Sequence, residues 1–340
     1  MKPEGAGSTQ LISLADGARW RAEVESMPHG FGHRPEYAAA AARVSGLETV
    51  LWSHRGERGR ALCVLALRDA PGGFDIVTPL GFAGFALEGE VPGLAEAWSE
   101  DWRARGAIAA YVQLSPFDSP PAWQARLGAL AQWLRPSPDC WCWDLRPEPA
   151  QLFAAMAKKH RQLLQKWLRE GAESVRDQDE LRAAFPALYG DFLRRQPMPA
   201  VYHYDADALA QLADAPGVLY VGARGEDGAI EAITIFLHSG SQAEGFLNAA
   251  TPRGRRHSRG LYWQAMLELR AAGVLDLNLG GGIRPGDSLE EFKQRLGTRR
   301  APTLALRQVF DDARYRAACA AVGVEPTTEG YFPAWRRRPA

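Results

Sequence analysis

The chain has 340 residues, of which 46% are hydrophobic and 24% are charged, a balance typical of a folded protein rather than of a disordered one. Its 40 basic and 40 acidic residues cancel, and binding along DNA is therefore disfavoured, because proteins that hold long nucleic acids electrostatically are usually basic. The sequence shows neither a signal-peptide core nor an apolar run of about 20 residues, so we expect a cytoplasmic protein without a transmembrane segment.

The first part of the chain predicts one mixed α/β unit. A polar turn separates two apolar runs and indicates a β-hairpin, and an alanine-rich helix precedes it. The predicted elements, in order, are a helix at Pro35–Arg43, strands at Val50–Trp52, Ala61–Leu67 and Phe74–Val77, a helix at Leu94–Arg105 and a strand at Ile108–Leu114.

The proline-rich stretch Arg135–Asp139 is interpreted as a structure breaker before a strand at Cys140–Leu145. The spacing of Cys140 and Cys142 places both thiols on one face of that strand, and without a second pair or a nearby histidine they do not form a zinc set. We place the boundary between two modules near residue 148, which gives modules at 1–148 and 149–340.

The second part predicts helices, then strands, then a helix and a last strand, an order similar to that of the first part. The ranges are helices at Ala150–Gly171 and Asp177–Gln196, strands at Val218–Ala223, Ile230–His238 and Gly245–Ala249, a helix at Ser258–Ala272 and a strand at Val274–Leu279. The order of helices and strands thus favours α/β modules with mixed sheets.

The helix predicted at Ala150–Gly171 has an apolar face and a basic ridge that includes Lys158 and Arg161. A ridge of this kind is either a solvated helix face or a site for an anionic substrate. His160 lies on the apolar side, where a core histidine with satisfied hydrogen bonds is the expected reading.

A basic, glycine-containing loop lies between a predicted strand and a predicted helix. Backbone N–H groups, a helix N-terminus and positive side chains together suit phosphate groups, and Ser258 is a reasonable N-cap. The alternative is an ordinary solvated connection. The predicted anion-binding residues are Arg253, Gly254, Arg255, Arg256, Ser258, Arg259 and Gly260.

The segment Leu277–Gly297 combines a strand end, three glycines, a polar turn and a short helix at Leu289–Leu296. Glycines permit a close backbone approach, although a helix-terminating turn would also explain them. Lys293 follows Phe292, and a fixed lysine can stabilise developing negative charge. The sequence has neither a nucleophile elbow nor a metal-ligand cluster, so a reaction between two bound substrates with one proton acceptor is favoured.

Several of these segments together resemble the Fem-type peptidyltransferases and related GNAT-like acyltransferases. Met156–Gly171 is similar to the family's basic helix, Phe246–Leu261 to its strand, loop and helix, and Leu277–Gly297 to its closing Gly-Asp-Gly…Phe-Lys…Phe-Gly signature. Phe31–Tyr37 and Pro79–Gly84 are similar to its entry helix and glycine-rich turn. The likeness runs from about residue 30 to residue 310.

The resemblance implies two tandem GNAT-like modules and an acyl transfer from acyl-CoA, as a co-substrate that is not permanently bound, to an amine, amino-sugar or peptide acceptor. It places Lys293 near the transfer site, with Asp287 as a nearby carboxylate, and the donor at the arginine loop. Predicted substrate contacts are Lys158, Arg161, Tyr202, Tyr204, Gly281 and Phe292. A loop packed on the second module is the alternative for the two tyrosines.

The chain departs from the family pattern at Ser288, Leu296 and the turn Pro79–Gly84, and no helical-hairpin arm is predicted. The missing arm makes formation of a cell-wall bridge less expected and favours a shorter relative that uses CoA. The resemblance to such relatives implies a role in envelope or exopolysaccharide metabolism. Two alternatives stay open: a peptidyltransferase that uses aminoacyl-tRNA, and a binding protein that has lost catalysis. The Arg336–Arg338 run is interpreted as a solvated terminus.

Overall fold

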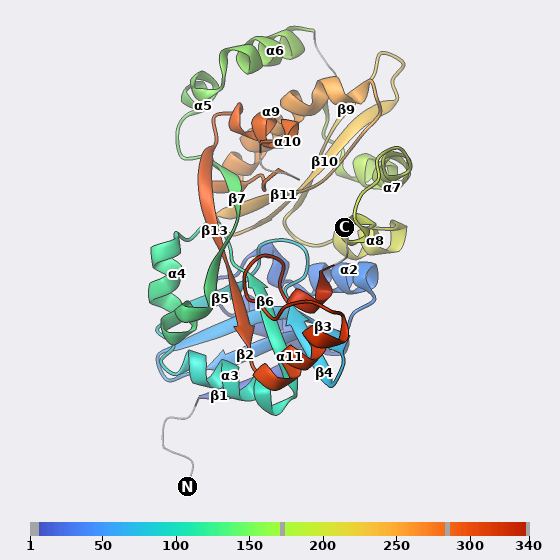
Figure 1. Ribbon diagram of the computed structural model, residues 1–340. Helices are drawn as coiled ribbons and strands as arrows, with labels where there is room; N and C mark the ends of the chain where they lie inside the picture. The colour runs from blue at the N-terminus through green and yellow to red at the C-terminus, as the bar shows by residue number, and fades with distance from the viewer. Residues whose placement is uncertain (1–6, 171–173, 283–285, 338–340) are drawn as a thin grey trace. The chain divides into compact units, whose positions relative to one another are not determined.

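The computed structural model describes residues 7–170, 174–282 and 286–337. The chain divides into two compact units: unit 1 is the segment up to Pro138 together with the segment from Pro302 onward, and unit 2 is Asp139–Ala301. The sequence placed a single boundary near residue 148, whereas the last segment of the chain groups with the first unit. Figure 1 shows the elements of each unit.

Unit 1 is built on a mixed sheet in which β1 (Ser8–Ser13), β2 (Thr49–Arg55), β3 (Gly59–Ala70), β4 (Gly73–Val77), β6 (Ala107–Gln113) and the end of β13 (Arg299–Val309) follow one another, with β5 (Phe85–Gly89) on β3. The β2–β3 pair is antiparallel, which confirms the predicted hairpin. The β4–β6 pair is parallel, and the crossover between its strands includes α3 (Leu94–Ala104). This pair is the feature that unit 1 shares with unit 2.

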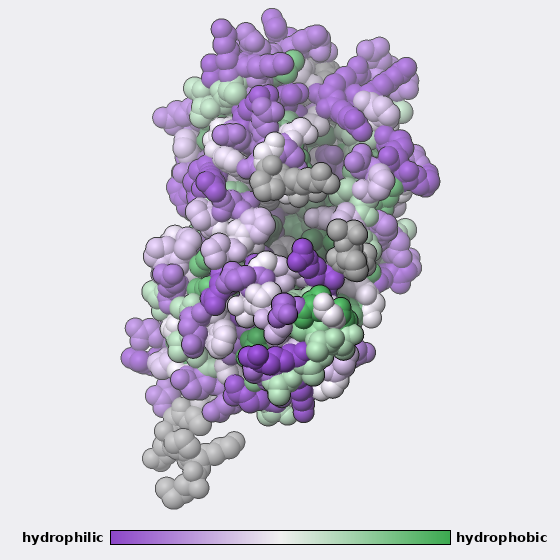
Figure 2. Space-filling view, in the orientation of Figure 1, coloured by the Kyte–Doolittle hydropathy of each residue, from purple (hydrophilic) through white to green (hydrophobic). Residues whose placement is uncertain are grey.

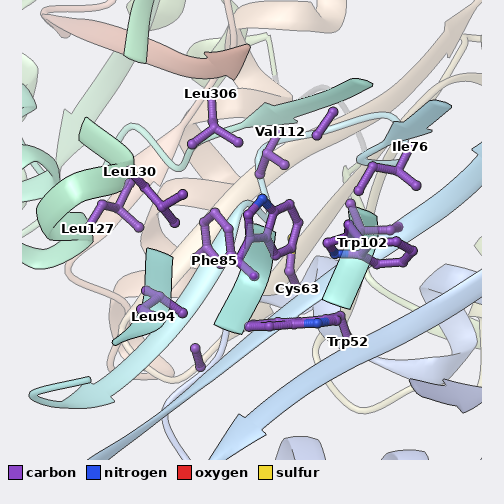
Figure 3. Close-up of a cluster of buried hydrophobic side chains, with 14 of the residues drawn as sticks. Trp52, Cys63, Ile76, Phe85, Leu94, Trp102, Val112, Leu127, Leu130 and Leu306 are labelled. Carbon is purple, nitrogen blue, oxygen red and sulfur yellow. The ribbon is translucent and has the colours of Figure 1, made fainter. Parts of the chain in front are cut away.

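Alternating residues of β2 and β3 bury both faces of this sheet. Trp52 and Cys63 point into a cluster with Trp98 and Trp102 of α3 and with Phe85 (Figure 3). The opposite face packs on α1 (Gly17–Glu25) and α2 (Pro35–Ser45), and α4 (Pro120–Leu127) and α11 (Asp312–Ala321) complete the unit. The aromatic side chains bury large apolar areas, so this sheet is the stable core of unit 1.

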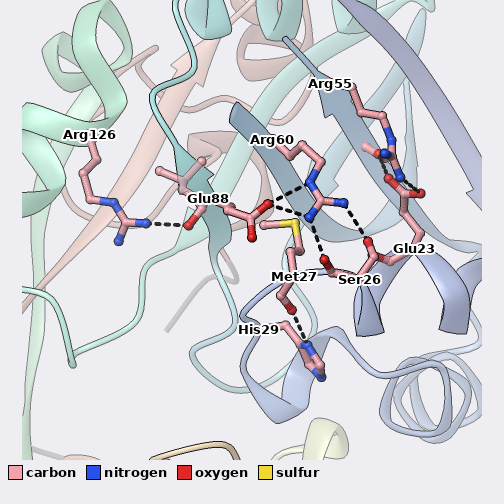
Figure 4. Close-up of polar contacts among 10 residues, drawn as sticks. Glu23, Ser26, Met27, His29, Arg55, Arg60, Glu88 and Arg126 are labelled. Atoms are coloured by element: carbon pink, nitrogen blue, oxygen red, sulfur yellow. Dashed lines mark hydrogen bonds and ion pairs between the residues drawn. The ribbon is translucent and has the colours of Figure 1, made fainter. Parts of the chain in front are cut away.

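Charged groups of unit 1 are matched with partners. The carboxylate of Glu23 accepts hydrogen bonds from Ser53 at 2.7 Å and Arg55 at 2.6 Å, and Arg60 bridges Glu88 and Ser26 (Figure 4). Buried ionised groups are stable only when they are paired in this way.

Asp75 of β4 is the most enclosed example, with a side chain that is fully buried. It accepts from Arg68 Nε at 2.7 Å and from Arg336 Nη2 at 2.6 Å. The interpretation of residues 336–338 as a solvated terminus is therefore wrong for Arg336, because a buried carboxylate holds its guanidinium; Arg338 lies outside the described residues.

The strands of unit 2 also form mixed sheet, in which the end of β7 (Leu134–Asp144) is followed by β12 (Asp276–Asn278), β11 (Gln242–Ala250), β10 (Ile230–Ser239), β9 (Val218–Arg224) and β8 (Ser174–Val175). The β11–β12 pair is parallel, and its crossover helix is α9 (Ser258–Ala271). The strands predicted at Val218–Ala223, Ile230–His238 and Gly245–Ala249 and the helix predicted at Ser258–Ala272 are confirmed.

One face of this sheet packs on α9 through Trp143, Phe236 and Leu277. On the other face lie α7 (Gln178–Arg195) and α8 (Ala206–Ala213). The approach of α7 is close: a Cβ atom on Gly222 of β9 would lie 2.2 Å from Leu181 Cδ2, so only glycine fits there.

The stretch predicted as a structure breaker, Arg135–Asp139, is part of β7. Its two prolines, Pro136 and Pro138, alternate along the strand, and their missing N–H groups therefore face the same strand edge. The carbonyl of Pro138 still accepts a hydrogen bond from Thr303 Oγ1 at 2.9 Å. The prediction failed because two prolines at alternate positions remove donors from one edge only.

The single helix predicted at Ala150–Gly171 is two helices, α5 (Pro149–Ala155) and α6 (Lys158–Arg169). Met156 between them has extended dihedral angles, with φ −63° and ψ 149°. Arg161 Nη1 donates to the carbonyls of Ala154 and Met156 at 2.8 and 2.5 Å, and thus satisfies groups that the break leaves free. The helical periodicity is continuous across the break, which is why the pattern alone missed it.

Candidate functional site

Lys293 is on α10 (Ser288–Gln294), the helix that follows the glycine-rich end of β12 along the chain. Only 6% of its surface is exposed, and its Nζ donates to the carbonyl of Gly281 at 2.5 Å. Burial lowers the pKa of Lys293 to about 8, against the opposing effects of Cys140, Asp287 and Glu290. The side chain is therefore an ammonium group near neutral pH, held in a largely enclosed place.

The glycines beside Lys293 are required by geometry. Gly280 has a φ of +70°, and a Cβ atom on Gly281 would lie 2.8 Å from the carbonyl oxygen of Asp139. A side chain at either position would move the strand end away from β7 or strain the backbone. The unusual dihedral angle is thus present at Gly280, while close approach of a ligand stays a prediction.

Phe292 faces a different set of neighbours from Lys293. Its ring lies 5.5 Å from the ring of Tyr262 on α9 and 5.6 Å from that of His160 on α6. The guanidinium of Arg259 stacks over it at 5.7 Å from the centroid. Phe292 therefore anchors α10 on α6 and α9 and keeps Lys293 in position.

Asp287 is the N-cap of α10, and its carboxylate accepts the Glu290 N–H at 2.8 Å. A capping carboxylate stabilises a helix N-terminus by about 1 kcal/mol. This contact gives Asp287 a structural task, and its catalytic role stays a prediction.

The sequence missed Glu244, which lies on β11 directly beside Asn278 of β12 and across from Leu237 of β10. Cys142 of β7 is the register partner of Asn278, so Cys142, Asn278 and Glu244 form a row on one face of the sheet. Burial raises the pKa of Glu244 to about 7, although its side chain keeps partial access to solvent. Within the described part of the chain, no hydrogen bond or ion pair to its carboxylate is recorded.

The alternation of the strand does not single out Glu244. Ala243, Leu247 and Ala249 are buried, and strict alternation would place Glu244 on the opposite face, where a charged residue is common. The predicted strand begins at Gly245 and therefore does not include Glu244.

Cys140 links Glu244 to Lys293. Burial raises the pKa of the Cys140 thiol, Glu244 raises it further, and Lys293 lowers it. Both charged groups are therefore within electrostatic range of the same thiol. Cys140 and Cys142 are buried free thiols on a strand, as predicted.

The β11–β12 pairing ends where Glu244 lies. The parallel register covers only Gln242–Glu244 against Asp276–Asn278, and the β10–β11 register shifts just beyond, between Ile235 and Phe236. Irregularities of this kind re-aim side chains and free backbone groups, and they are common at binding sites. The carboxylate is thus placed where two parallel strands part.

The arginine loop begins with the 3₁₀ helix η5 (Gly254–His257), which runs directly into α9. A Cβ atom on Gly254 would lie 2.0 Å from the carbonyl oxygen of Glu231, so the loop is pressed against β10. Ser258 is not the N-cap that the sequence predicted: its hydroxyl donates to the Arg255 carbonyl at 3.1 Å, because the preceding residues are already helical. Gly260 packs on the Trp167 ring, where a Cβ atom would lie 2.3 Å away.

His257 connects this loop to α6 and β10. Trp167 Nε1 lies 2.9 Å from His257 Nδ1, and Glu231 Oε2 lies 3.2 Å from His257 Nε2. Because an indole N–H can only donate, Nδ1 must accept, and Nε2 must carry the proton toward Glu231. Burial lowers the pKa of His257, so this tautomer is the form expected at neutral pH.

The loop arginines divide into three kinds. Arg256 lies 3.5 Å from Glu231 and 3.9 Å from Glu226, which offset its charge. Arg259 turns toward Phe292. Arg253 and Arg255 are exposed, without a recorded carboxylate partner among the described residues, and they are the two that best fit the predicted anion site.

The other residues predicted to contact substrate differ in how exposed their side chains are. Lys158 is exposed on the first turn of α6, whereas Arg161 caps α5. Tyr204 is buried with its ring 5.2 Å from that of Phe246 on β11, and the carbonyl of Tyr202 accepts from Tyr189 at 2.5 Å. The tyrosine segment is therefore packed on unit 2, and it borders the strand that carries Glu244.

No group of three or more histidine, cysteine, aspartate or glutamate side chains in residues 7–170, 174–282 and 286–337 is arranged to hold a metal ion. Over the same ranges, no helix combines the length and the apolar character that crossing a bilayer requires.

No family model matches the chain, and no curated protein matches it in sequence. Solved structures, however, share its fold. FemX gives a TM-score of 0.68 at 12% identity, over 91% of this chain and 99% of FemX. The C-terminal domain of a protein assigned as a lysylphosphatidylglycerol synthetase, from Agrobacterium fabrum, gives 0.56 at 17% identity, over 94% and 99% of the two chains. L-PGS from Bacillus licheniformis gives 0.56 at 12% identity, over 86% and 91%.

At these identities the likeness concerns the fold alone. It confirms the predicted α/β class, and it shows that the chain shares the fold of FemX, of the Agrobacterium fabrum domain and of L-PGS.

Proposed function

We propose that this protein is an acyltransferase that moves an acyl group onto an amine, and that unit 2 carries the transfer site. The observation that carries the proposal is the placement of a buried ammonium group, Lys293, and a partly buried carboxylate, Glu244, within electrostatic range of Cys140 where β11 and β12 part. Such perturbed groups concentrate at functional sites.

The chemistry needs one proton acceptor and one stabiliser of negative charge. An amine that attacks an acyl carbonyl must lose a proton, and Glu244, with a pKa of about 7, accepts it near neutral pH. The carbonyl oxygen becomes negative as the N–C bond forms, and the Lys293 ammonium is suited to stabilise it. The carbonyl then re-forms as the bond to the leaving group breaks; if the donor is a thioester, a thiolate leaves and takes up the proton that the amine gave to Glu244.

The donor in this proposal is an acyl-CoA, bound only as a co-substrate. Its phosphates meet Arg253 and Arg255 at the start of α9, where exposed guanidinium groups and a helix N-terminus favour anions. The acceptor is a small amine, an amino-sugar or a peptide, with Tyr202 and Tyr204 beside β11 as neighbouring contacts. Envelope or exopolysaccharide metabolism is the setting that we propose.

Two alternatives compete with this function. An aminoacyl-tRNA donor would use the same carboxylate and lysine but would need a larger basic surface. The exposed basic residues of α6 are the observation that supports this alternative. A protein that binds the donor without catalysis would need neither Glu244 nor Lys293.

A two-step experiment tests the proposal. Thermal unfolding is measured with acyl-CoAs of several chain lengths and with aminoacyl-tRNA; a ligand at about 100 times its Kd should add about 2.7 kcal/mol of stability. Mass spectrometry then follows acylation of an amine mixture by the donor that binds. Stabilisation by an acyl-CoA, with a product that disappears in Glu244→Gln while binding persists, is the expected result. Activity only with aminoacyl-tRNA, or binding without any product, contradicts it.

A further inference from the structure

His160 has a buried nitrogen without a partner. It lies in the first turn of α6 and only 2% of its surface is exposed. Its ring is 5.6 Å from that of Phe292, and its Nδ1 has no hydrogen-bond partner among the described residues. The sequence predicted a core histidine with satisfied hydrogen bonds; the burial is confirmed, but the satisfaction is not, because no polar group of the described chain reaches Nδ1.

Positive groups surround this histidine. The Arg259 guanidinium stacks on the same Phe292 ring, and its Nε is likewise buried and without a recorded partner in the described ranges. After burial, the charges of Arg259, Arg295 and Lys159 are the causes that lower the pKa of His160 to about 4. Arg295 also pairs with the carboxylate of Glu291, and both of these side chains are about half exposed.

The N-terminus of α6 adds to the same field. This helix has 12 residues, and its N-cap, Ala157, offers no side-chain acceptor to the first turn. The free N–H groups of a helix start carry about half a positive charge, which favours anions. Ala157 itself donates to the Arg295 carbonyl at 3.0 Å, so the end of α10 holds Arg295 at this helix start.

We propose that His160, Arg259, Arg295 and the N-terminus of α6 form a binding site for a phosphate or diphosphate group. The site is separate from Arg253 and Arg255, and it does not depend on acyl transfer, since it would bind the anion whatever group is transferred.

The chemistry of the site selects this ligand class. Its groups are donors: a guanidinium Nε–H, helix N–H groups and, in the tautomer with the proton on Nδ1, an imidazole N–H. A phosphate offers several strong acceptor oxygens in a compact tetrahedron, and arginine binds it with good geometry. The phosphate can come from a CoA donor or from a nucleotide-linked acceptor.

The first test measures binding of inorganic pyrophosphate to the full chain by calorimetry at low ionic strength. We expect Arg259→Gln to weaken binding tenfold or more. The matched control is Arg169→Gln, which removes the same charge from the exposed last turn of α6 and should change binding less than twofold. Equal weakening in both variants would show unspecific attraction and would overturn the proposal, as would the absence of binding.

The second test places the anion. The His160 imidazole is followed by ¹⁵N NMR with and without pyrophosphate, and its pKa should rise on binding because a neighbouring anion stabilises the imidazolium. An unchanged His160 resonance together with binding that is lost in Arg255→Gln would put the anion at the loop and refute the site. Displacement of pyrophosphate by coenzyme A assigns the phosphate to the donor, and displacement by a nucleoside diphosphate alone assigns it to the acceptor.

Discussion

In the described residues, each unit contains a parallel strand pair whose first strand carries a carboxylate. In unit 1, Asp75 of β4 is fully buried and is held by Arg68 and Arg336. In unit 2, Glu244 of β11 lies at the end of its pair without a recorded counter-ion in the described residues, and burial raises its pKa to about 7. The same kind of position is thus structural where the charge is compensated and is suited to proton transfer where it is not.

The largest expected effect is the loss of the compensated pair. Asp75→Asn leaves two guanidinium groups near a neutral amide in a buried place, and we expect unfolding free energy to fall by about 3–5 kcal/mol. Chemical denaturation measures this. Asp312→Asn, which removes an exposed partner of Arg316, is the control and should cost less than about 0.5 kcal/mol. An equal loss of stability in Asp75→Asn and Asp312→Asn would show that the buried carboxylate of Asp75 is not structural, and the contrast with Glu244 would fail.

Glu244→Gln should raise the free energy of unfolding above pH 7, whereas Asp75→Asn should lower it. The folded pKa of Glu244 lies above its value in the unfolded chain, so the folded state holds the proton more tightly, and stability is lost as pH rises from about 4.5 to about 7. We expect the variant to be more stable than the wild type at pH 8, by no more than about 3 kcal/mol, and equally stable at pH 4. Transfer should fall by about 100-fold.

The control for this variant is Glu170→Gln, which changes an exposed carboxylate of unit 2. A pH-independent difference between Glu244→Gln and the wild type would show that the carboxylate is not destabilised by burial.

Lys293→Met tests the other charged group beside Cys140. It keeps the length and apolar stem but removes the ammonium, and we expect transfer to fall at least tenfold, or about 1.4 kcal/mol in the barrier, with donor binding little changed. Steady-state kinetics separates these effects. Activity within about twofold of the wild type would remove Lys293 from the mechanism.

The smallest effect is expected in the pH profile of the wild type. Transfer should rise as Glu244 loses its proton near pH 7 and decline as Lys293 loses its own near pH 8, which gives a narrow bell. Glu244→Gln should lose the acid limb selectively. A profile that stays flat from pH 6 to pH 9 would contradict both assignments.

The sequence predicted most elements because their periodicity is local. The hairpin of β2 and β3 and the crossover helix α9 follow from runs of apolar residues. The break at Met156 escaped because the helical pattern continues across it, and it depends on Arg161, which reaches back to two carbonyls.

The candidate site was only partly visible in the sequence. Lys293 stands out through its neighbours, since glycines and an aromatic residue lie close along the chain. Glu244 acquires its character from Asn278 and Cys142, which lie far away in the sequence, and its pKa depends on a burial that no local pattern reports. The order of motifs therefore predicted the fold better than it predicted the carboxylate of Glu244.

The division of the chain also sets an order of assembly. Unit 2 is contained in Asp139–Ala301, whereas unit 1 lacks β13, α11 and Arg336 until its last segment is made. On a ribosome, unit 2 is complete while the edge of β6 and the carboxylate of Asp75 still wait for their partners. We therefore expect the final residues to close the first unit late, so that a shortened C-terminus damages the beginning of the protein more than its middle.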